Sequence, residues 1–200
     1  MVLLFGIVNP PVTHTIWAEW RRLGRVERDW VPAEAIAPVM LRAAVAAEDA
    51  NFCWHWGFDM AAIREAIGDG ATRGASTISQ QVVKNVFLWQ GRSWARKALE
   101  AVLTPMVEAF WTKRRILEVY LNVAEFGEGI FGVEAAARHY YGISAAELSP
   151  RQAARLAVLL PNPKQRDPNA LSSRMRRVAA RVADGAEMIR ADGRAACFES

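Results

Sequence analysis

Apolar residues recur three and four positions apart through almost all of this 200-residue chain, and no long stretch alternates strictly between apolar and polar residues. The first spacing places side chains on one face of an α-helix, whereas alternation favours a β-strand. The pattern predicts helices over residues 33–48, 60–67, 78–87, 92–111, 113–123, 132–141, 150–160 and 172–190. The sequence therefore predicts an all-α fold.

Local signals refine two of these helices. Thr77 and Gln80 form a capping box, S/T-x-x-E/Q, in which each side chain bonds a backbone amide at the helix start. Pro105 lies inside the predicted helix 92–111 and removes one backbone hydrogen bond, so we expect a kink there. Residues 127–132 spell G-x-G-x-x-G, but a helix precedes them where a dinucleotide-binding fold requires a strand, so we interpret them as a tight loop.

Composition favours one domain with a substantial core, because 52% of the 200 residues are hydrophobic. Eight Trp and eight Phe exceed the needs of such a core. The excess favours an aromatic surface that meets a membrane or a large amphipathic substrate. Use of the aromatic residues as core filler is the alternative.

The net charge of +4 originates in the C-terminal quarter, where residues 151–200 hold 10 basic and 5 acidic side chains, against 15 and 16 in residues 1–150. The last predicted helix contributes Arg174, Arg176, Arg177 and Arg181. Such a cluster can attract anionic lipid head groups or nucleic acid. We favour a solvated helix face, because the aromatic residues that interleave with basic ones in nucleic-acid binders are missing here. We therefore expect no nucleic-acid partner.

The N-terminal segment MVLLFGIV meets Asn9, Pro10 and Pro11, so its apolar run is far shorter than the roughly 20 residues of a spanning helix. The segment also lacks the basic start and the small-residue cleavage site of a signal peptide. We interpret residues 1–12 as the remnant of a membrane anchor and residues 13–200 as the folded domain. A buried strand or a loose end is the alternative for the first segment.

The two cysteines, Cys53 and Cys197, are far apart in the sequence. Disulfide frameworks and metal sites are recognised by larger sets of cysteines at short spacings. We therefore expect neither, and the redox compartment stays open.

Four segments carry polar residues where a purely structural helix would have apolar or neutral ones. They are AAEDANFCWHWGFD (46–59), GASTISQQVVKN (74–85), GRSWARKALE (91–100) and RRILEVYLNVAEFGEGIFG (114–132). In order and spacing they closely resemble the motifs of glycosyltransferase family 51, which read E-D-x-x-F-x-x-H-x-G, G-x-S-T-I-x-Q-Q, R-K-x-x-E and I-L-E-x-Y-L-N. The resemblance runs from about Met40 to Pro163. Any one motif is weak evidence, but four in this order are specific.

This resemblance implies an all-α, two-lobed fold, with a larger lobe related to lysozyme, a smaller membrane-facing lobe and a cleft between them. Residues 13–200 would form this domain. Because no penicillin-binding domain follows residue 200, the chain resembles the monofunctional biosynthetic peptidoglycan transglycosylases. These enzymes polymerise lipid II into glycan strands, with loss of undecaprenyl diphosphate and inversion at C1.

Location and partners follow from the same resemblance. The catalytic domain would lie on the periplasmic side of the bacterial inner membrane. Its partners would be lipid II, the growing lipid-linked glycan, the membrane and other cell-wall synthesis proteins. The loop 68–74 and the segment 86–94 would border the cleft, with Phe87, Leu88 and Trp89 reaching into lipid.

The resemblance assigns the two catalytic carboxylates to Glu48 and Glu100. Glu48 would take the proton of the attacking 4-hydroxyl, an effect worth about 10²- to 10⁴-fold in rate. Burial and the neighbouring Asp49 are expected to raise the pKa of Glu48. Glu100 would orient Arg96 or Lys97, or share a divalent cation (Mg²⁺ or Mn²⁺) with the diphosphate, and the sequence does not choose between these roles.

The leaving diphosphate needs positive charge and hydrogen-bond donors already aimed at it, and Lys84 and Arg92 are the candidates. The remaining substrate-binding candidates are Ser76, Gln80, Gln81, Asn85, Arg96, Lys97, Glu118 and Asn122. Glu118 and Asn122 lie one helical turn apart and would brace the cleft or contact substrate. We expect His55 to be a packed histidine that bonds a backbone carbonyl rather than a catalytic group.

Alternative functions predict different residue use. A lysozyme-like hydrolase or lytic enzyme would use one glutamate as a general acid on finished glycan, without the basic cradle of Lys84 and Arg92. A binding module without catalysis would not need intact glutamates at positions 48 and 100. A third reading makes Glu100, Arg92 and Arg96 an exposed ion-pair ladder, with about 0.3–0.5 kcal/mol per pair. The four ordered motifs favour the glycosyltransferase.

Overall fold

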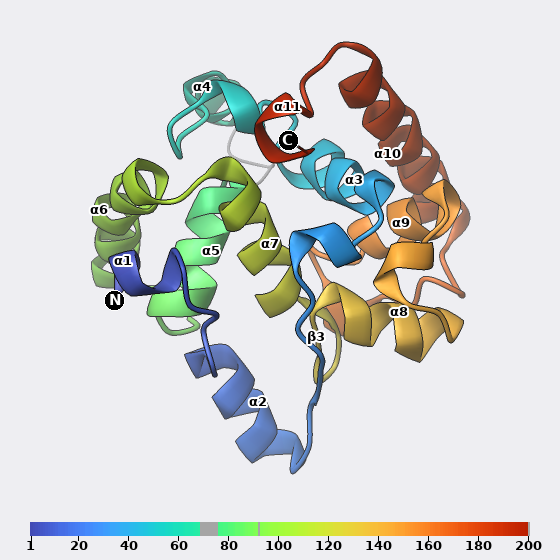
Figure 1. Ribbon diagram of the computed structural model, residues 1–200, viewed down its shortest axis with the longest axis horizontal. Helices are drawn as coiled ribbons and strands as arrows, with labels where there is room; N and C mark the ends of the chain where they lie inside the picture. The colour runs from blue at the N-terminus through green and yellow to red at the C-terminus, as the bar shows by residue number, and fades with distance from the viewer. Residues whose placement is uncertain (69–75, 92, 200) are drawn as a thin grey trace.

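The structure is a computed structural model that describes residues 1–68, 76–91 and 93–199 (Figure 1). Its α-helices are α1 (Val2–Phe5), α2 (His14–Leu23), α3 (Pro38–Glu48), α4 (Met60–Gly68), α5 (Ile78–Phe87), α6 (Trp94–Phe110), α7 (Lys113–Val123), α8 (Val133–Tyr141), α9 (Pro150–Ala157), α10 (Ser173–Ala191) and α11 (Ala196–Glu199). Short 3-10 helices are η1 (Ala33–Ala35), η2 (Phe52–Trp54), η3 (Ala145–Glu147) and η4 (Pro163–Gln165). The all-α prediction is confirmed.

The larger helices pack in two groups on either side of α7 (Figure 1). In one group α3, α9 and α10 contact one another, and in the other α5 contacts both α6 and α7. Ile116, Leu117, Val119, Tyr120 and Leu121 are all buried on α7. The apolar face of this amphipathic helix is buried in the core, where α7 packs against α5, α8 and α11.

Local sequence signals set several helix boundaries. The capping box of Thr77 and Gln80 begins α5, as predicted. The predicted helix 33–48 is instead η1 followed by α3, which begins at Pro38, because proline favours the first helical position and restricts the residue before it. α6 begins at Trp94 with Ser93 as its cap and continues through Pro105 to Phe110.

A small sheet, which the sequence did not predict, joins the N-terminal segment to the middle of the chain. Its strands are β1 (Glu27–Arg28), β2 (Glu125–Gly127) and β3 (Ile130–Phe131), in the order β1-β3-β2. β1 pairs with β3 in parallel and β2 pairs with β3 in antiparallel orientation. Strands of two or three residues are too short to show alternation. The G-x-G-x-x-G segment supplies the tight turn between β2 and β3, as expected.

The two cysteines form a disulfide, which the sequence did not predict. Cys53 lies inside the first motif, in η2, and Cys197 lies in α11, 144 residues later. Phe198 beside it is buried, and Glu199 pairs with Arg42 of α3 at 2.6 Å. Packing of α11 against α7 and η2 brings the two cysteines together, and no sequence spacing reports such packing.

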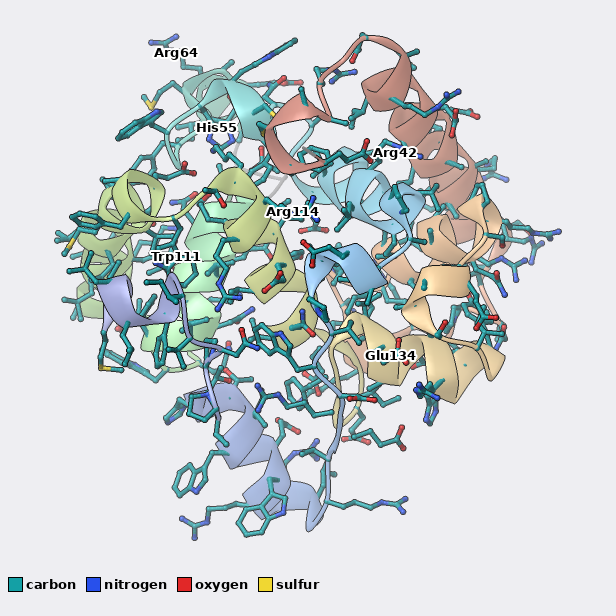
Figure 2. The ribbon with its side chains drawn as sticks, in the orientation of Figure 1. Arg42, His55, Arg64, Trp111, Arg114 and Glu134 are labelled. Atoms are coloured by element: carbon teal, nitrogen blue, oxygen red, sulfur yellow. A yellow bond between two sulfur atoms is a disulfide. The ribbon has the colours of Figure 1, made fainter. Side chains whose placement is uncertain are left out.

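The N-terminal residues rest on the α6–α7 region. Val2 is buried, and the Trp111 indole nitrogen donates to the Val2 carbonyl at 2.8 Å (Figure 2). Leu3, Leu4 and Ile7 stay exposed. Within the described residues, no helix has the length and apolar character needed to span a membrane. The origin of residues 1–12 as part of an anchor stays a prediction.

Candidate active site

Glu48 is the last residue of α3 and points towards α5. The amide nitrogen of Gln81 donates to its carboxylate at 2.8 Å, and the Tyr120 hydroxyl donates to the Gln81 oxygen at 3.3 Å. This relay through Gln81 holds the carboxylate in one orientation. Burial raises the pKa of Glu48 and the Asp49 charge adds to this, whereas the Gln81 bond and the Lys84 charge lower it by less. A partly buried carboxylate with a raised pKa has the proton affinity that a general base needs.

The next residue, Asp49, joins the first motif to α5. It bonds His55 Nε2 at 2.8 Å and accepts from the backbone amide of Ile78 at 3.0 Å. The amide of Gly57 donates to His55 Nδ1 at 3.1 Å, so the hydrogen bonds assign the His55 proton to Nε2. His55 is packed as expected, but its partner is a carboxylate and not the predicted backbone carbonyl. Sequence reasoning missed this role of Asp49, although the adjacent Glu-Asp pair was its signal.

Gly57 lets this motif lie close to α6. Its φ of +83° is in the left-handed region, and a Cβ there would meet Thr104 Cγ2 at 2.4 Å. The Gly57 carbonyl accepts from the Thr77 hydroxyl at 2.7 Å. A side chain at this position would therefore displace the loop that positions Glu48.

Lys84 lies one turn after Gln81 on α5, between the two predicted catalytic carboxylates. Its charge interacts with Glu48 of α3 and with Glu100 of α6. Burial lowers the pKa of Lys84, and the Glu100 charge opposes this. The structure therefore places Lys84 on the same helix as Gln81, the residue that hydrogen-bonds Glu48, and Lys84 and Gln81 line one cavity.

Glu100 is almost fully buried, with 3% of its side chain exposed. One of its oxygens accepts from Arg96 Nη1 at 2.9 Å, and the other accepts from Lys97. Arg96 Nε also donates to the Gly91 carbonyl at 2.8 Å. The arrangement is a buried carboxylate that orients two cations, not an exposed ladder of ion pairs.

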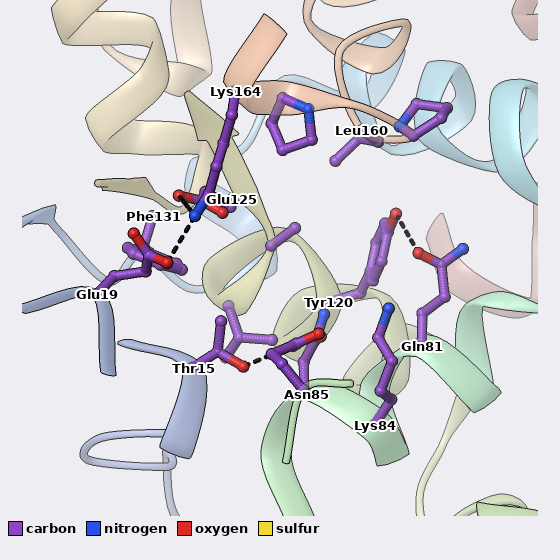
Figure 3. A pocket seen from close by; sticks show the side chains of 15 residues that line it. Thr15, Glu19, Gln81, Lys84, Asn85, Tyr120, Glu125, Phe131, Leu160 and Lys164 are labelled. Carbon is purple, nitrogen blue, oxygen red and sulfur yellow. Dashed lines mark hydrogen bonds and ion pairs between the residues drawn. The ribbon is translucent and has the colours of Figure 1, made fainter. Parts of the chain in front are cut away.

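Lys84 lines a cavity of about 380 Å³ with Gln81, Asn85 and Tyr120 (Figure 3). Its other wall comes from α2, β2 and η4, and the sequence analysis did not predict it. There Lys164 lies between Glu19, at 2.5 Å, and Glu125, at 3.8 Å. Burial raises the pKa of Glu125. These residues are far apart in the sequence and carry no motif spacing, so no signal pointed to them.

Two further hollows adjoin Glu48. One, of about 370 Å³, is lined by Ser76, Thr77, Asn51 and other residues beside the first two motifs. The second, of about 520 Å³, lies between α3, α9 and α10. Glu48 lines both of these hollows, and its partner Gln81 lines the Lys84 cavity.

Not every predicted site residue reaches this groove. Gln80 is buried in the cap of α5, where its oxygen accepts from the Thr77 amide at 3.1 Å. Glu118 accepts from the Ala33 amide at 2.9 Å, and Asn122 bonds both backbone groups of Val31. These contacts brace the N-terminal segment. Arg92 lies outside the described residues, as does the predicted cleft loop from residue 69 onwards.

The segment that was expected to reach lipid is exposed only in part. Trp89 is 40% exposed, but Leu88 is buried at 5% exposure. Phe87 stacks on Phe5 and Trp111. The expectation for Leu88 was wrong because α5 ends at Phe87, and the following residue turns into the core.

A carboxylate with a raised pKa near a half-buried lysine, in a helical fold, is an arrangement that fits a group-transfer enzyme. The sequence model of one family, described as transglycosylase, matches residues 15–187. A biosynthetic peptidoglycan transglycosylase of Jannaschia sp. strain CCS1 is 61% identical over 197 residues, which are 98% of this chain and 82% of that protein. Proteins with the same description from Yersinia pseudotuberculosis and Yersinia pestis are 58% identical over 149 residues, which are 72% of this chain and 62% of theirs.

The chain therefore belongs to the transglycosylase family. The predicted enzyme class, a peptidoglycan glycosyltransferase with a lysozyme-like helical domain, is confirmed, and the lytic alternative is not favoured.

Proposed function

We propose that this enzyme joins lipid II units into glycan strands, with Glu48 as the general base and Lys84 as the main cation at the leaving diphosphate. One observation carries the proposal: Gln81 holds the Glu48 carboxylate while Lys84, one turn along α5, interacts with the charge of Glu48. The base can take the proton that the acceptor hydroxyl loses, and the cation can stabilise the negative charge that the diphosphate gains.

In the proposed reaction, the 4-hydroxyl oxygen of the acceptor attacks C1 of the donor sugar. Its proton passes to Glu48, and the bond between C1 and the diphosphate oxygen breaks with both electrons leaving on that oxygen. Attack opposite the leaving group inverts C1. Glu48 returns its proton to water before the next transfer.

The negative charge that develops on the diphosphate oxygen is stabilised by cations already in place. Lys84 is nearest to the base, and Arg96 and Lys97 are held on α6 by Glu100. We assign Glu100 to this orienting role. Asn85 and Ser76 line the groove and add hydrogen-bonding groups.

A divalent cation is not required by this arrangement. Both oxygens of Glu100 already accept from cations, and in the described parts of the chain no three His, Cys, Asp or Glu side chains could hold an ion together. Mg²⁺ is commonly held by one or two carboxylates together with substrate phosphates, so an ion shared by Glu100 and the diphosphate would have to compete with Arg96 and Lys97 for the carboxylate oxygens. We expect polymerisation to persist in EDTA. If EDTA abolishes polymerisation and added Mg²⁺ or Mn²⁺ restores it, a divalent cation takes part in the reaction.

We also propose that the domain docks on the outer face of the inner membrane. Exposed apolar side chains lie along α6 and the adjoining N-terminal segment, namely Leu3, Leu4, Ile7, Trp89, Trp94, Leu99, Val102, Met106 and Phe110. Such a surface favours lipid contact. Flotation with liposomes checks it: Val102→Glu with Phe110→Glu should reduce binding, whereas Met188→Glu on the exposed face of α10 should not.

The direct test follows polymerisation of labelled lipid II by the wild type, Glu48→Gln and Glu100→Gln. Glycan polymer from the wild type and its loss in Glu48→Gln support the proposal. Near-normal turnover by Glu48→Gln contradicts the assigned base. Muropeptide release from purified peptidoglycan, without polymer from lipid II, would favour the lytic alternative instead.

A further inference from the structure

Apart from Glu48, the residues that line the hollow of about 520 Å³ between α3, α9 and α10 have no role in the proposed reaction. It begins at Glu48, so a molecule whose hydroxyl lies at that carboxylate can extend into it. Its wall combines apolar side chains, among them Val158 and Met175, with two arginines, Arg166 and Arg174. The hollow is therefore basic, partly apolar and continuous with the reacting centre.

The two arginines are available to a ligand. Arg166 is half-buried, and its Nη1 donates to the Val158 carbonyl at 2.5 Å, which leaves the other edge of the guanidinium unused by that bond. Arg174 is exposed near the start of α10. Among the described residues, neither side chain forms an ion pair with a carboxylate, unlike Arg96 or Arg115. Fixed guanidinium groups of this kind favour carboxylate or phosphate ligands.

The position of the hollow decides between these two anions. The exposed apolar side chains that we propose to face the membrane lie mainly on α1 and α6, whereas α10 lies on the opposite side of the molecule (Figure 1). A lipid-linked diphosphate must stay close to the membrane-facing surface and to Lys84. A substituent on the α10 side must be soluble and anionic, which fits a peptide with free carboxylates.

We propose that this hollow binds the acidic peptide carried by the acceptor substrate, with Arg166 and Arg174 contacting its carboxylates. The inference rests on the proposed function, because it places the acceptor hydroxyl at Glu48. Binding of the peptide would set the position of the acceptor sugar relative to the base. The hollow would thus select acceptors by the charge of their peptide.

The expected size of the effect is modest. Ion pairs at partly exposed sites contribute up to about 1 kcal/mol, which corresponds to about fivefold in kcat/KM. Exposed pairs are screened by salt, so the preference should weaken as ionic strength rises. The change should appear mainly in KM, because the arginines contact a part of the substrate that does not react.

The test compares two acceptors in polymerisation: lipid II with a free-carboxylate peptide and the same molecule with its peptide carboxylates amidated. The wild type should use the first about fivefold better. Arg174→Gln should reduce this preference, and Arg166→Gln with Arg174→Gln should abolish it. Arg181→Gln, an exposed arginine on the same helix that does not line the hollow, is the matched control and should keep the preference.

Equal use of both acceptors by the wild type would overturn the inference while leaving the proposed function intact. A preference that survives in the double variant, or that falls equally in Arg181→Gln, would also overturn it. If the wild type makes no polymer from either acceptor, the proposed function fails and this inference fails with it.

Discussion

The two sides of the groove hold their carboxylates in different ways. On the base side, Glu48 at the end of α3 accepts from the neutral amide of Gln81. On the leaving-group side, Glu100 of α6 accepts from two cations, Arg96 and Lys97. A buried carboxylate with a neutral partner retains proton affinity, whereas one that bonds two cations serves to position them. Glu48 is partly buried and Glu100 almost fully buried, and their neighbours suit them to the different tasks that we propose.

The supports of the two sides also differ. The base side is joined to the C-terminus by the disulfide of Cys53 and Cys197, and Asp49 links it to α5. The leaving-group side depends on ion pairs within one helix turn of α6. We therefore expect the side with Glu48 to be sensitive to reduction of the disulfide, and the side with Glu100 to be sensitive to loss of a charged residue.

The largest effect should come from Glu48→Gln. Removal of the base should lower the rate of polymerisation by about 10²- to 10⁴-fold. Because burial raises the pKa of Glu48, its ionised form costs stability as pH rises through that pKa. The variant should therefore unfold at an equal or higher temperature at neutral pH. Polymerisation assays with labelled lipid II and thermal unfolding check the two effects, with the surface variant Glu187→Gln as control. Normal turnover by Glu48→Gln would show that the two carboxylates do not differ in the way proposed.

Reduction of the disulfide should have the next largest effect. Loss of a link between residues 144 positions apart should lower the free energy of unfolding by about 2–4 kcal/mol. Denaturant unfolding of the wild type and of Cys53→Ser with Cys197→Ser, each with and without dithiothreitol, measures it. The reductant should destabilise only the wild type. An unchanged midpoint would show that packing of α11 alone supports the base side.

Glu100→Gln should leave Arg96 and Lys97 without their carboxylate. Loss of two charged hydrogen bonds at a buried acceptor should cost about 1.5–3 kcal/mol of stability, reduced by the exposure of Lys97. Activity should fall because both cations lose their orientation. Chemical denaturation and steady-state kinetics test this, with Glu187→Gln again as control. If activity falls without any loss of stability, Glu100 contacts substrate directly.

The smallest effect should be a shift in the pH dependence of kcat. Glu48 acts only when ionised, so the rate should fall as pH falls through its raised pKa. The Gln81 hydrogen bond lowers that pKa, so Gln81→Leu should move the acidic limb to higher pH. Gln165→Leu, at an exposed amide bonded to Asn162, should leave the limb in place. A limb that moves to lower pH in Gln81→Leu would contradict the role of this bond.

The sequence predicted much of the helical framework and several of the functional residues. Caps such as the Thr77–Gln80 box act over three residues, so they can be recognised without the fold. The ordered motifs likewise predicted Glu48, Lys84 and Glu100 as residues of one site, and that assignment stays a prediction. The sign of the pKa shift of Glu48 was also foreseen, from expected burial and the neighbouring Asp49.

Longer-range contacts could not be predicted in this way. The disulfide, the short sheet and the wall formed by Glu19, Glu125 and Lys164 join segments from distant parts of the chain. Asn122 hydrogen-bonds Val31, 91 positions away in the sequence. The side chain of this predicted substrate-binding residue is therefore already bonded to the N-terminal backbone.

The amino-acid sequence by itself determined the helices, their starts and the chemical groups available for transfer, because these depend on residue type and on neighbours within a few positions. Only the tertiary structure decided the partners of those groups: Gln81 for Glu48, two cations for Glu100, and the two arginines that line a hollow with Glu48. Partners set burial and charge, which in turn set proton affinity. The division of labour between two chemically identical carboxylates is therefore a property of the fold.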